Sequence, residues 1–471
     1  MNTVVMLITT VLVFGIVIYM LIKKMDIKTT LFAMGIVLMY VAIFMGNDIA
    51  IKDFTSTGVK WLDPLAAVIS QFKTTISGAG LIILVLGGYS SYMSSIGAND
   101  VTVHVLTKPV MKIKSVYILV PFVFVLVNVL SLVIPSASNL AIILLATLYP
   151  VLRSAGMSSM TAAAIIATAA TVMPTPLGGD NVAIANELAN YPQYAGLTVT
   201  DYVIQYHAII SVPTLLVMAI AHFFWQKHMD KHMPKEEGLP VANAEVQAIE
   251  GSKLFKIVYA ILPVFPILLL IAIYIMQTML HMQINISVEV ASIFSLIIAI
   301  FCELIRKKGT SSVLAQTEEF FKGMGNSMSI VALLVSASVF VLGLNSIGLI
   351  SSLQNMMTSI KGNGLGFILP LILVGLSLLI VFLSGSGTAL FYAMVPLMMP
   401  LAIAAGINAT AISVPMALAG NLMRAVSPVA AVTVIVAGFI KVNPLDLVKR
   451  TSVPMLSGII FMFIFSMMIL L

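Results

Sequence analysis

The sequence predicts an all-α polytopic membrane protein with about ten transmembrane helices in two inverted repeats, each with a re-entrant hairpin and a broken helix. Three observations predict this fold. Of the 471 residues, 60% are hydrophobic and 9% are charged, whereas soluble domains carry roughly 25% charged residues. Apolar segments of about 20 residues, the length that crosses a bilayer, recur along the chain. Polar breaks rich in Gly, Ser and Pro interrupt four such segments, and they repeat about 250 positions apart.

The composition also excludes several classes of protein. A water-soluble globule of this size could not bury so many apolar side chains, so soluble enzymes, disordered proteins and nucleic-acid binders are excluded for the whole chain. The net charge of +6 lies in short loop clusters, which is the usual orientation signal of a membrane protein. The single cysteine, Cys302, cannot form an intramolecular disulfide. The sequence has no Cys/His zinc cluster, and no metal site is predicted with certainty.

The uninterrupted spans follow from the apolar runs. The first, 3–22, has no basic segment before it and no small-residue cleavage site after it, so we expect a retained helix rather than a cleaved signal peptide. The other uninterrupted spans are expected at 28–46, 75–96, 204–226, 255–279, 287–305, 326–345 and 453–471.

The interrupted segments form two pairs of a hairpin and a broken helix. The first pair is 115–152 and 158–190, and the second is 364–404 and 408–442. Irregular backbone at membrane depth survives only where it is buried in protein or lines a cavity. Proline kinks alone account poorly for breaks such as Gly-Gly-Asp-Asn, so we expect re-entrant hairpins and unwound helices. We call residues 135–139 the first tip and residues 384–388 the second tip.

The chain is therefore expected to divide into a first repeat, 1–226, a cytoplasmic linker, 227–256, and a second repeat, 257–471. Five crossings and a hairpin in each half make an odd number of crossings, so the second half is inverted, as in many transporters. With both termini outside, nineteen of the 24 Lys and Arg fall in inside loops and four in outside loops. This asymmetry predicts periplasmic N- and C-termini.

Two charged residues, Asp180 and Arg424, lie inside the breaks rather than in loops or at helix ends. A charge at mid-membrane costs at least about 2.5–3.5 kcal/mol, so each indicates a functional site. The alternative is that the two side chains pair with each other as a buried lock. The histidines indicate no site, because His207 and His222 lie near the two ends of one span and a surface position is favoured for each.

The chemistry of the breaks suits a small molecule with two anionic ends. Helix N-termini at the two tips would point toward the midplane, where their free N–H groups attract carboxylates, and the planar guanidinium of Arg424 matches one carboxylate. Packing between helices is the alternative role for the small polar residues. The expected substrate-binding residues are Ser136, Ser138, Asn139, Ser384, Ser386, Thr388, Asn421 and Arg424. Asp180, together with Asn181, is expected to bind a coupling proton or cation.

Several stretches carry a family resemblance. The segments 92–100, 108–109, 221–226 and 449–454 occur in one order, together with 384–387 and the break at Gly179-Asp180. In this combination, which runs over essentially the whole chain, the sequence resembles the anaerobic C4-dicarboxylate carriers of the DcuC type.

The resemblance implies a secondary carrier of succinate, fumarate, malate or aspartate in the bacterial cytoplasmic membrane, working by exchange or by proton- or cation-coupled efflux and uptake. It also implies an elevator-type motion, a homodimer and no cofactor beyond a coupling proton or Na⁺. Related sodium-coupled symporters carry Ser-Asn-Thr at each tip. Here Ser138-Asn139-Leu140 lacks the Thr and Ser386-Gly387-Thr388 lacks the Asn. Proton coupling or exchange is therefore expected at least as much as sodium coupling.

Other functions on the same fold are a sodium/proton-type ion antiporter or a carrier for another small organic anion. Arg424 favours an anionic substrate, whereas Asp180 alone would favour a cation. An intramembrane aspartyl protease needs two aspartates at membrane depth, and only Asp180 qualifies. The sequence contains no His-Glu-x-x-His zinc motif and no nucleotide-binding loop, so we expect a transporter and not an enzyme.

Overall fold

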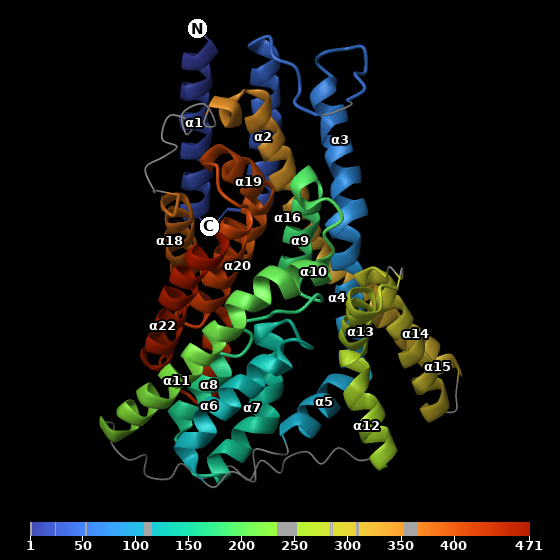
Figure 1. Ribbon diagram of the computed structural model, residues 1–471, viewed down its shortest axis with the longest axis vertical. Helices are drawn as coiled ribbons and strands as arrows, with labels where there is room; N and C mark the ends of the chain where they lie inside the picture. The colour runs from blue at the N-terminus through green and yellow to red at the C-terminus, as the bar shows by residue number, and fades with distance from the viewer. Residues whose placement is uncertain are drawn as a thin grey trace.

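The computed structural model describes residues 2–23, 25–51, 54–107, 115–232, 252–282, 284, 286–307, 310–352 and 366–471. The regular secondary structure of these residues is entirely helical, which confirms the predicted all-α membrane architecture. In this part of the chain eight helices are long and apolar enough to cross a membrane, and shorter apolar helices accompany them. Most of the helices run along the long axis of the molecule (Figure 1).

The first half of the chain contains eleven labelled α-helices with short 3₁₀ or π turns between some of them. They are α1 Asn2–Ile22, α2 Ile27–Phe44, α3 Asp63–Thr75, the π turn Ile76–Gly80, α4 Leu81–Ser95, α5 Ala98–Thr107, α6 Val116–Leu130, α7 Ala137–Ser154, α8 Ser159–Ala167, α9 Gly179–Ala189, the 3₁₀ turn Pro192–Tyr194, α10 Val199–Tyr202, the π turn Val203–His207 and α11 Ala208–His232.

In the described residues the second half contributes ten labelled α-helices and one 3₁₀ turn. Its helices are α12 Lys253–Ile261, the 3₁₀ turn Leu262–Val264, α13 Phe265–Leu280, α14 Val288–Lys307, α15 Thr310–Gln316, α16 Glu318–Ser346, α18 Ile368–Ser384, α19 Thr388–Ala405, α20 Thr410–Arg424, α21 Ala431–Phe439 and α22 Pro444–Leu470. The middle of the predicted linker, 233–251, lies outside the described residues, as do 108–114, which include the resemblance segment 108–109, and 364–365 at the start of the second hairpin. The division into repeats and linker stays a prediction.

Every uninterrupted span coincides with a helix, but several helices begin before their apolar part. The helix expected at 75–96 starts at Asp63, because the Asp63 carboxylate accepts hydrogen bonds from the Ser56 hydroxyl (2.8 Å) and the Thr57 backbone N–H (2.8 Å). In the same way α16 starts at Glu318 and α22 at Pro444. Hydropathy detects only the apolar part of a helix, whereas capping and turn residues determine where the helix begins.

Helix α16 is the central support of the molecule, because it packs tightly against both α2 and α4. Glycines make these contacts close. A Cβ on Gly35 of α2 would lie 2.6 Å from the Val339 carbonyl oxygen of α16, and one on Gly323 of α16 would lie 2.5 Å from the Gly87 carbonyl oxygen of α4. Small residues let helix backbones approach in this way in membranes. We call α2, α4 and α16 the scaffold.

The two hairpins lie toward opposite ends of the molecule. In Figure 1 the hairpin of α6 and α7 lies in the lower part, and the hairpin of α18 and α19 lies higher. Ser136 caps the N-terminus of α7 by accepting a hydrogen bond from the Asn139 N–H (3.5 Å). Gly385 ends α18 in the left-handed conformation. These residues reverse the chain where the apolar run is interrupted, and α8 and α21 both pack against α7 of the first hairpin.

Candidate functional site

The break between α8 and α9 is held open by one buried asparagine. Asn128 of α6 is 1% exposed, and its Oδ1 accepts hydrogen bonds from the Thr171 N–H (3.1 Å), the Thr171 hydroxyl (3.0 Å) and the Val172 N–H (3.3 Å). Its Nδ2 donates to the carbonyl oxygens of Phe124 (3.0 Å) and Thr168 (3.3 Å). Asn128 therefore satisfies backbone groups that leave the helix at this break, as the low-dielectric interior requires.

Each break is also fastened to the hairpin of its own half by an equivalent bond. The Thr175 hydroxyl donates to the Leu132 carbonyl oxygen (3.1 Å), and the Ser427 hydroxyl donates to the Phe382 carbonyl oxygen (2.8 Å). Leu132 and Phe382 are 250 positions apart, the offset at which the sequence breaks repeat. The two halves thus use the same contact to keep a hairpin against an unwound helix.

The second tip packs against the break between α20 and α21 through close contacts with backbone atoms. Gly385 has a φ of +73°, and a Cβ there would lie 2.6 Å from the Val429 carbonyl oxygen and 2.7 Å from the Ala430 nitrogen. A Cβ on Gly387 would lie 3.4 Å from the Gly420 Cα. The second tip therefore lies next to the residue that precedes Asn421.

The two breaks meet at Asp180. Asn421 Nδ2 of α20 donates to Asp180 Oδ2 (3.1 Å), while Asp180 Oδ1 accepts from the Asn181 N–H (3.0 Å) in the first turn of α9. The N-terminus of a helix favours a carboxylate at this position. One Arg424 guanidinium nitrogen donates to the Ala170 carbonyl oxygen (3.1 Å), at a residue whose φ is +59°. Each break therefore bonds directly to the other.

Asp180 and Arg424 do not pair. Within the described residues no ion pair joins them, although the carboxylate lies near enough to act electrostatically on the guanidinium. Both side chains are partly accessible, and each has taken a neutral partner from the opposite break. The alternative of a buried Asp180–Arg424 lock is therefore not what the structure contains.

Buried polar atoms without a partner surround these residues. Among the described side chains, five such atoms belong to the breaks or to the helices packed on them: Asn181 Oδ1, the Tyr202 hydroxyl, His207 Nδ1, Ser413 Oγ and Arg424 Nε. Tyr202 packs edge-on against His207 with ring centroids 6.4 Å apart, and Asp180 acts electrostatically on both. A buried polar group without a partner is costly, so the cluster is suited to a ligand or water that would complete its hydrogen bonds.

Several members of this cluster were not identifiable from the sequence. The hydroxyl of the buried Tyr392 would lie 2.8 Å from a Cβ on Gly179 in the first turn of α9, and α10, which carries Tyr202, packs against α9. The expectation that His207 and His222 lie at the surface is wrong, because they are 1% and 0% exposed. The π turn Val203–His207 at the start of α11 directs His207 inward, and no hydropathy pattern reports such a turn.

The predicted tip residues have differing surroundings. Ser136 and Ser138 are half-buried and Asn139 is exposed. In the described part of the chain no hydrogen bond joins these three to Asp180 or Arg424. The exposed Ser384 hydroxyl donates to the Ile380 carbonyl oxygen (2.7 Å) and accepts from the Ser386 N–H (3.2 Å), so it stabilises the second tip itself.

Other tip and break residues complete the set. The Ser386 side chain is exposed, and Thr388 begins α19 with a side chain outside those described. Asn181 is fully buried, and its Nδ2 donates to the carbonyl oxygens of Met173 (3.0 Å) and Thr175 (2.9 Å). The roles of these residues toward a substrate or ion stay predictions.

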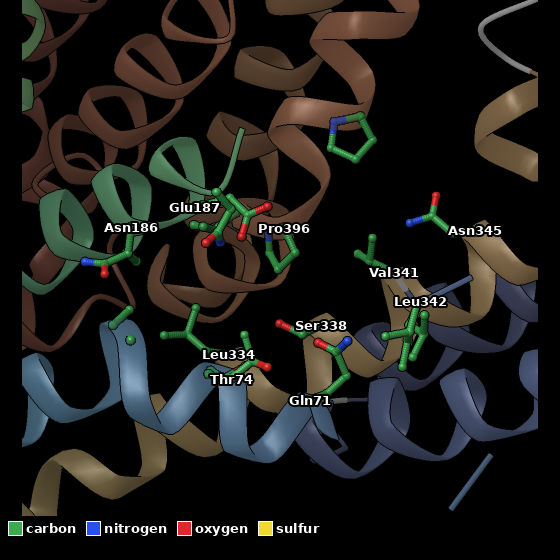
Figure 2. Close-up of a pocket in the computed structure, with 18 of the residues that line it drawn as sticks. Gln71, Thr74, Asn186, Glu187, Leu334, Ser338, Val341, Leu342, Asn345 and Pro396 are labelled. Carbon is green, nitrogen blue, oxygen red and sulfur yellow. The ribbon is translucent and has the colours of Figure 1, made fainter. Parts of the chain in front are cut away.

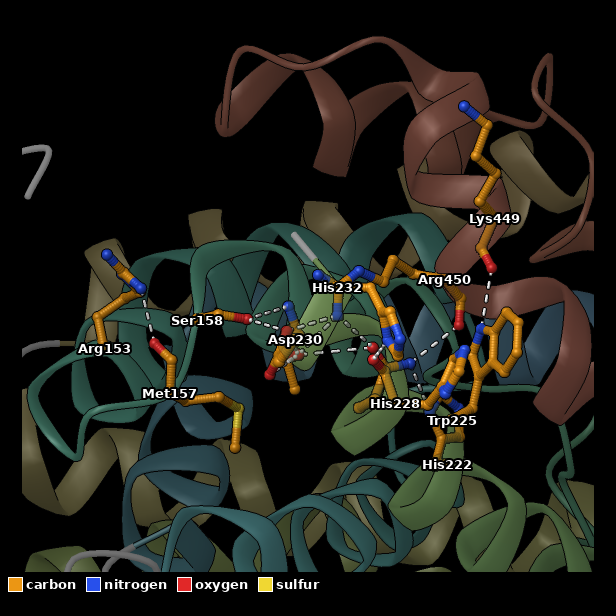
Figure 3. A network of polar contacts seen from close by, with 12 residues as sticks. Arg153, Met157, Ser158, His222, Trp225, His228, Asp230, His232, Lys449 and Arg450 are labelled. Carbon is orange, nitrogen blue, oxygen red and sulfur yellow. Dashed lines mark hydrogen bonds and ion pairs between the residues drawn. The ribbon is translucent and has the colours of Figure 1, made fainter. Parts of the chain in front are cut away.

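A buried polar network supports the break from the lower part of the molecule (Figure 3). Arg450 of α22, 1% exposed, donates to Asp230 Oδ1 of α11 (2.6 Å). Asp230 also accepts from the hydroxyls of Ser158 (3.0 Å) and Thr161 (3.0 Å), at the start of α8. This network therefore joins the first turn of the broken helix to two long helices.

The network continues to the break through His222. Gln226 Nε2 lies 3.4 Å from His222 Nδ1, and His222 Nε2 lies 3.2 Å from the Thr168 hydroxyl. Because the Thr168 hydroxyl donates to backbone carbonyls of Ala164 and Ile165, we assign the imidazole proton to Nε2 from the hydrogen-bond pattern. His222 is thus a neutral positioning residue for Thr168, whose own carbonyl accepts from Asn128.

A cavity of about 510 Å³ opens between the scaffold and the broken helix. Figure 2 shows Glu187 beside Pro396, across from Thr74, Ser338 and Gln71. The walls come from α3, α9, α16 and α19, and Ala183, three residues after Asp180, belongs to the lining. Among the described residues no group of three or more His, Cys, Asp or Glu could hold a metal ion.

Comparison with known proteins gives a consistent result over the whole length. Residues 6–471 match the family model described as "C4-dicarboxylate anaerobic carrier". The chain is 35% identical over 456 residues to the anaerobic C4-dicarboxylate transporter DcuC of Escherichia coli strain K12, which covers 97% of this chain and 94% of that protein.

Two solved structures share the fold. The YdaH transporter of Alcanivorax borkumensis, described as having an unusual topology, superposes with a TM-score of 0.64 at 14% identity over 93% of this chain and 97% of its own. Neisseria gonorrhoeae MtrF, described with a class of antimetabolite efflux pumps, gives a TM-score of 0.61 at 13% identity over 93% and 94%. At these identities the likeness concerns the fold alone.

Proposed function

The chain belongs to the DcuC family of anaerobic C4-dicarboxylate carriers, and from this membership we propose that it is a secondary carrier of succinate, fumarate, malate or aspartate. It works by exchange or by proton- or cation-coupled efflux and uptake. The protein is a multi-pass transporter of the bacterial cytoplasmic membrane, and we propose that both termini lie on the periplasmic side. Its partner is a small dicarboxylate, and the functional unit is a homodimer.

The observation that carries this proposal is the unsatisfied guanidinium of Arg424. Its Nε is buried and has no partner among the described residues, while another nitrogen is anchored on the Ala170 carbonyl oxygen. An anchored, planar cation with free donors is a preorganised site for a carboxylate. The second tip, seated beside Asn421, supplies short polar side chains and helix N–H groups for the other end of the molecule.

Asp180 carries the coupling role in this proposal. A permanently charged carboxylate near Arg424 would repel a dianion, whereas a proton or a cation on Asp180 would remove that repulsion. Asn421 and Asn181 stabilise the charged form by donating to it. Loading of Asp180 and loading of the dicarboxylate are therefore favourable together, which is the thermodynamic condition for coupling.

An elevator-type motion is supported by the division of the molecule. The scaffold is joined by backbone-to-backbone contacts, whereas the two hairpins and two broken helices are fastened to one another by their own bonds. A cavity lined by α3, α9, α16 and α19 lies between α9 and α3, while α19 also packs directly on α16. We propose that the hairpins and broken helices move as one unit past the scaffold and carry the substrate with them.

The test is counterflow of labelled succinate in proteoliposomes, with and without sodium and at several pH values. Unlabelled fumarate or malate should compete with the label. A charged hydrogen bond contributes about 1.5–3 kcal/mol, so Arg424→Ala should raise KM roughly 10- to 150-fold, and Arg424→Lys should fall between it and the wild type because the ammonium lacks the planar fork. Asp180→Asn should change the pH or sodium dependence.

The matched control is Lys449→Ala, which removes an exposed positive charge in a surface pair with Asp446. It should transport like the wild type. Folded wild-type protein that shows no flux with any C4 acid would contradict the dicarboxylate assignment and leave the ion antiporter or another organic anion. Unchanged KM in Arg424→Ala would remove Arg424 from the binding site.

A further inference from the structure

Among the described residues that line the 510 Å³ cavity, Glu187 is the one charged side chain. The other polar side chains in this described lining are neutral, and it contains no Lys, Arg or His. Within the described part of the chain no hydrogen bond or ion pair satisfies the Glu187 carboxylate. Figure 2 draws it on the α9 wall, directed toward the side of the cavity formed by Pro396 of α19. In the described part of the chain, the Glu187 carboxylate therefore lies in a confined space without a counter-ion.

Glu187 lies on the same helix as Asp180. Both residues lie on α9, seven positions apart, which is about two turns or roughly 10 Å along one face of the helix. Ala183 lies between them and also lines the cavity. Asn186, the neighbour of Glu187, approaches Gly78, whose φ and ψ of −93° and −118° kink the helix formed by α3 and α4. The cavity therefore leads along α9 toward the break that holds Asp180.

The Glu187 carboxylate in this cavity needs a positive partner that can enter and leave, such as a small cation or a proton. An unpaired charge that is partly removed from water is costly, and the described lining supplies oxygen atoms but no cation. The amide and hydroxyl groups around the cavity, such as those of Thr74, Ser338 and Asn345, suit a small hard cation or a hydrated proton. A dianion that enters the same cavity would meet repulsion until Glu187 is neutralised.

We propose that Glu187 is a second binding site for a small monovalent cation, a proton or Na⁺, in the vestibule between scaffold and broken helix. The site is separate from Asp180 and is occupied before a dianion passes. The inference rests on the proposed carrier function and extends it, because it adds a gate that admits the anion only after a cation has bound.

The other ionisable groups near Glu187 are few. Apart from Glu187, the titratable side chains on α9 and on the described elements packed against it are Asp180 of α9, Tyr89 and Tyr92 of α4, Tyr191 and Tyr194 at the 3₁₀ turn, Asp201 and Tyr202 of α10, Tyr392 of α19 and, behind Asp180, His207. The tyrosines are neutral at ordinary pH, and the Asp201 carboxylate is engaged by the Thr198 N–H (3.0 Å) in a capping box. None of these groups provides a fixed positive charge beside Glu187.

The first measurement uses dicyclohexylcarbodiimide on the wild-type protein in proteoliposomes. Carbodiimides react with protonated carboxylic acids in poorly hydrated places: the acid proton moves to one nitrogen, the carboxyl oxygen bonds to the central carbon, and rearrangement leaves a stable acylurea. Fragment mass spectrometry then distinguishes modification at Glu187 from modification at Asp180. Labelling of Glu187 that falls as pH rises identifies a proton site. Labelling that sodium chloride suppresses at constant pH, and choline chloride does not, identifies a sodium site.

The second measurement compares counterflow by the wild type, Glu187→Gln and Glu187→Asp. Because Asp180 remains, Glu187→Gln should keep a shallower dependence on pH or sodium, falling from the steepness of two titrating groups to that of one, which changes about tenfold across two pH units. Glu187→Asp should keep the wild-type steepness with a shifted midpoint. Asn190→Asp adds an acidic group at the same cavity and should leave the Glu187 dependence in place.

Two outcomes overturn the proposal: Glu187 that stays unlabelled from pH 5 to pH 9, or a Glu187→Gln variant with the wild-type dependence on pH and sodium. The labelling needs no transport activity. Labelled Glu187 in a protein that moves no C4 acid would therefore contradict the substrate assignment while supporting the cation site.

Discussion

Replacement of Gly385 by alanine tests whether the second tip must pack against the break between α20 and α21. Gly385 has a φ of +73°, and a Cβ there would lie 2.6 Å from the Val429 carbonyl oxygen, which belongs to backbone and cannot rotate away. The left-handed conformation costs a non-glycine residue about 1–2 kcal/mol. Overpacking costs about 1–3 kcal/mol more. We therefore expect Gly385→Ala to destabilise the seated tip by roughly 2–5 kcal/mol.

This free-energy cost lowers the fraction of molecules in which the second tip is packed in place, because every 1.4 kcal/mol is a factor of about ten in an equilibrium. The population of the seated tip should fall at least about tenfold, and counterflow should fall with it. Gly385→Asn separates the two contributions, since asparagine tolerates the left-handed region but keeps the Cβ collision. It should recover little activity if the collision dominates.

Gly375→Ala is the matched control. Gly375 lies in the middle of α18, ten positions before Gly385, and a Cβ there would meet nothing within 4 Å. This variant should retain activity and gain stability, because alanine is the better helix former by roughly 0.8–1 kcal/mol. The assays are counterflow and thermal unfolding in detergent. Equal activity and equal melting temperature for Gly385→Ala and Gly375→Ala would refute the argument that the second tip is held by this contact.

Two further predictions concern the first break and the motion. Asn128→Leu leaves the N–H groups of Thr171 and Val172 without their acceptor, and at about 1–3 kcal/mol for each unsatisfied group it should lower the melting temperature clearly, whereas Val129→Ala at the exposed neighbour should not. A Gly78→Cys/Asn186→Cys pair in a Cys302→Ser background places thiols within reach, because a Cβ at 78 would lie 3.8 Å from Asn186 Oδ1. Oxidative cross-linking should arrest counterflow and reduction should restore it, while full activity of the cross-linked protein would contradict movement of α9 past α3 and α4.

The sequence was sufficient for the parts of the fold that depend on polarity. Each uninterrupted apolar run is a helix, and the chain reverses or unwinds where Ser136 and Gly385 interrupt an apolar run, because lipid allows irregular backbone only where other groups satisfy it. Asp180 and Arg424 could also be identified from the sequence, because each is a charged residue within an otherwise apolar segment. The starts of α3, α16 and α22 could not be predicted from hydropathy, since a helix continues past its apolar part until a cap ends it.

The partners of the site residues depend on the three-dimensional arrangement and could not be read from the chain. Asn421 donates a hydrogen bond to Asp180, and Arg424 donates one to the Ala170 carbonyl oxygen. Asp180 and Arg424 have opposite charges and could have paired with each other, but each has a neutral partner. Asn128 lies in an ordinary apolar run, where one amide gives no sign that it satisfies a break more than forty residues away. His207 is turned inward by a π turn, a backbone feature without a composition signal.

The packing of α16 limits how far anything can move beside it. Glycine contacts fix two of its sides to α2 and α4, while Leu334, Ser338, Val341 and Asn345 form a third side that lines the cavity. Their spacing of four, three and four residues follows one straight stripe of the helix. The stripe spans eleven residue steps, or about 16 Å at 1.5 Å per residue. In the proposed elevator motion, a unit that slides along this side of α16 without leaving it would move at most about 16 Å, roughly half the thickness of the hydrocarbon layer of a bilayer.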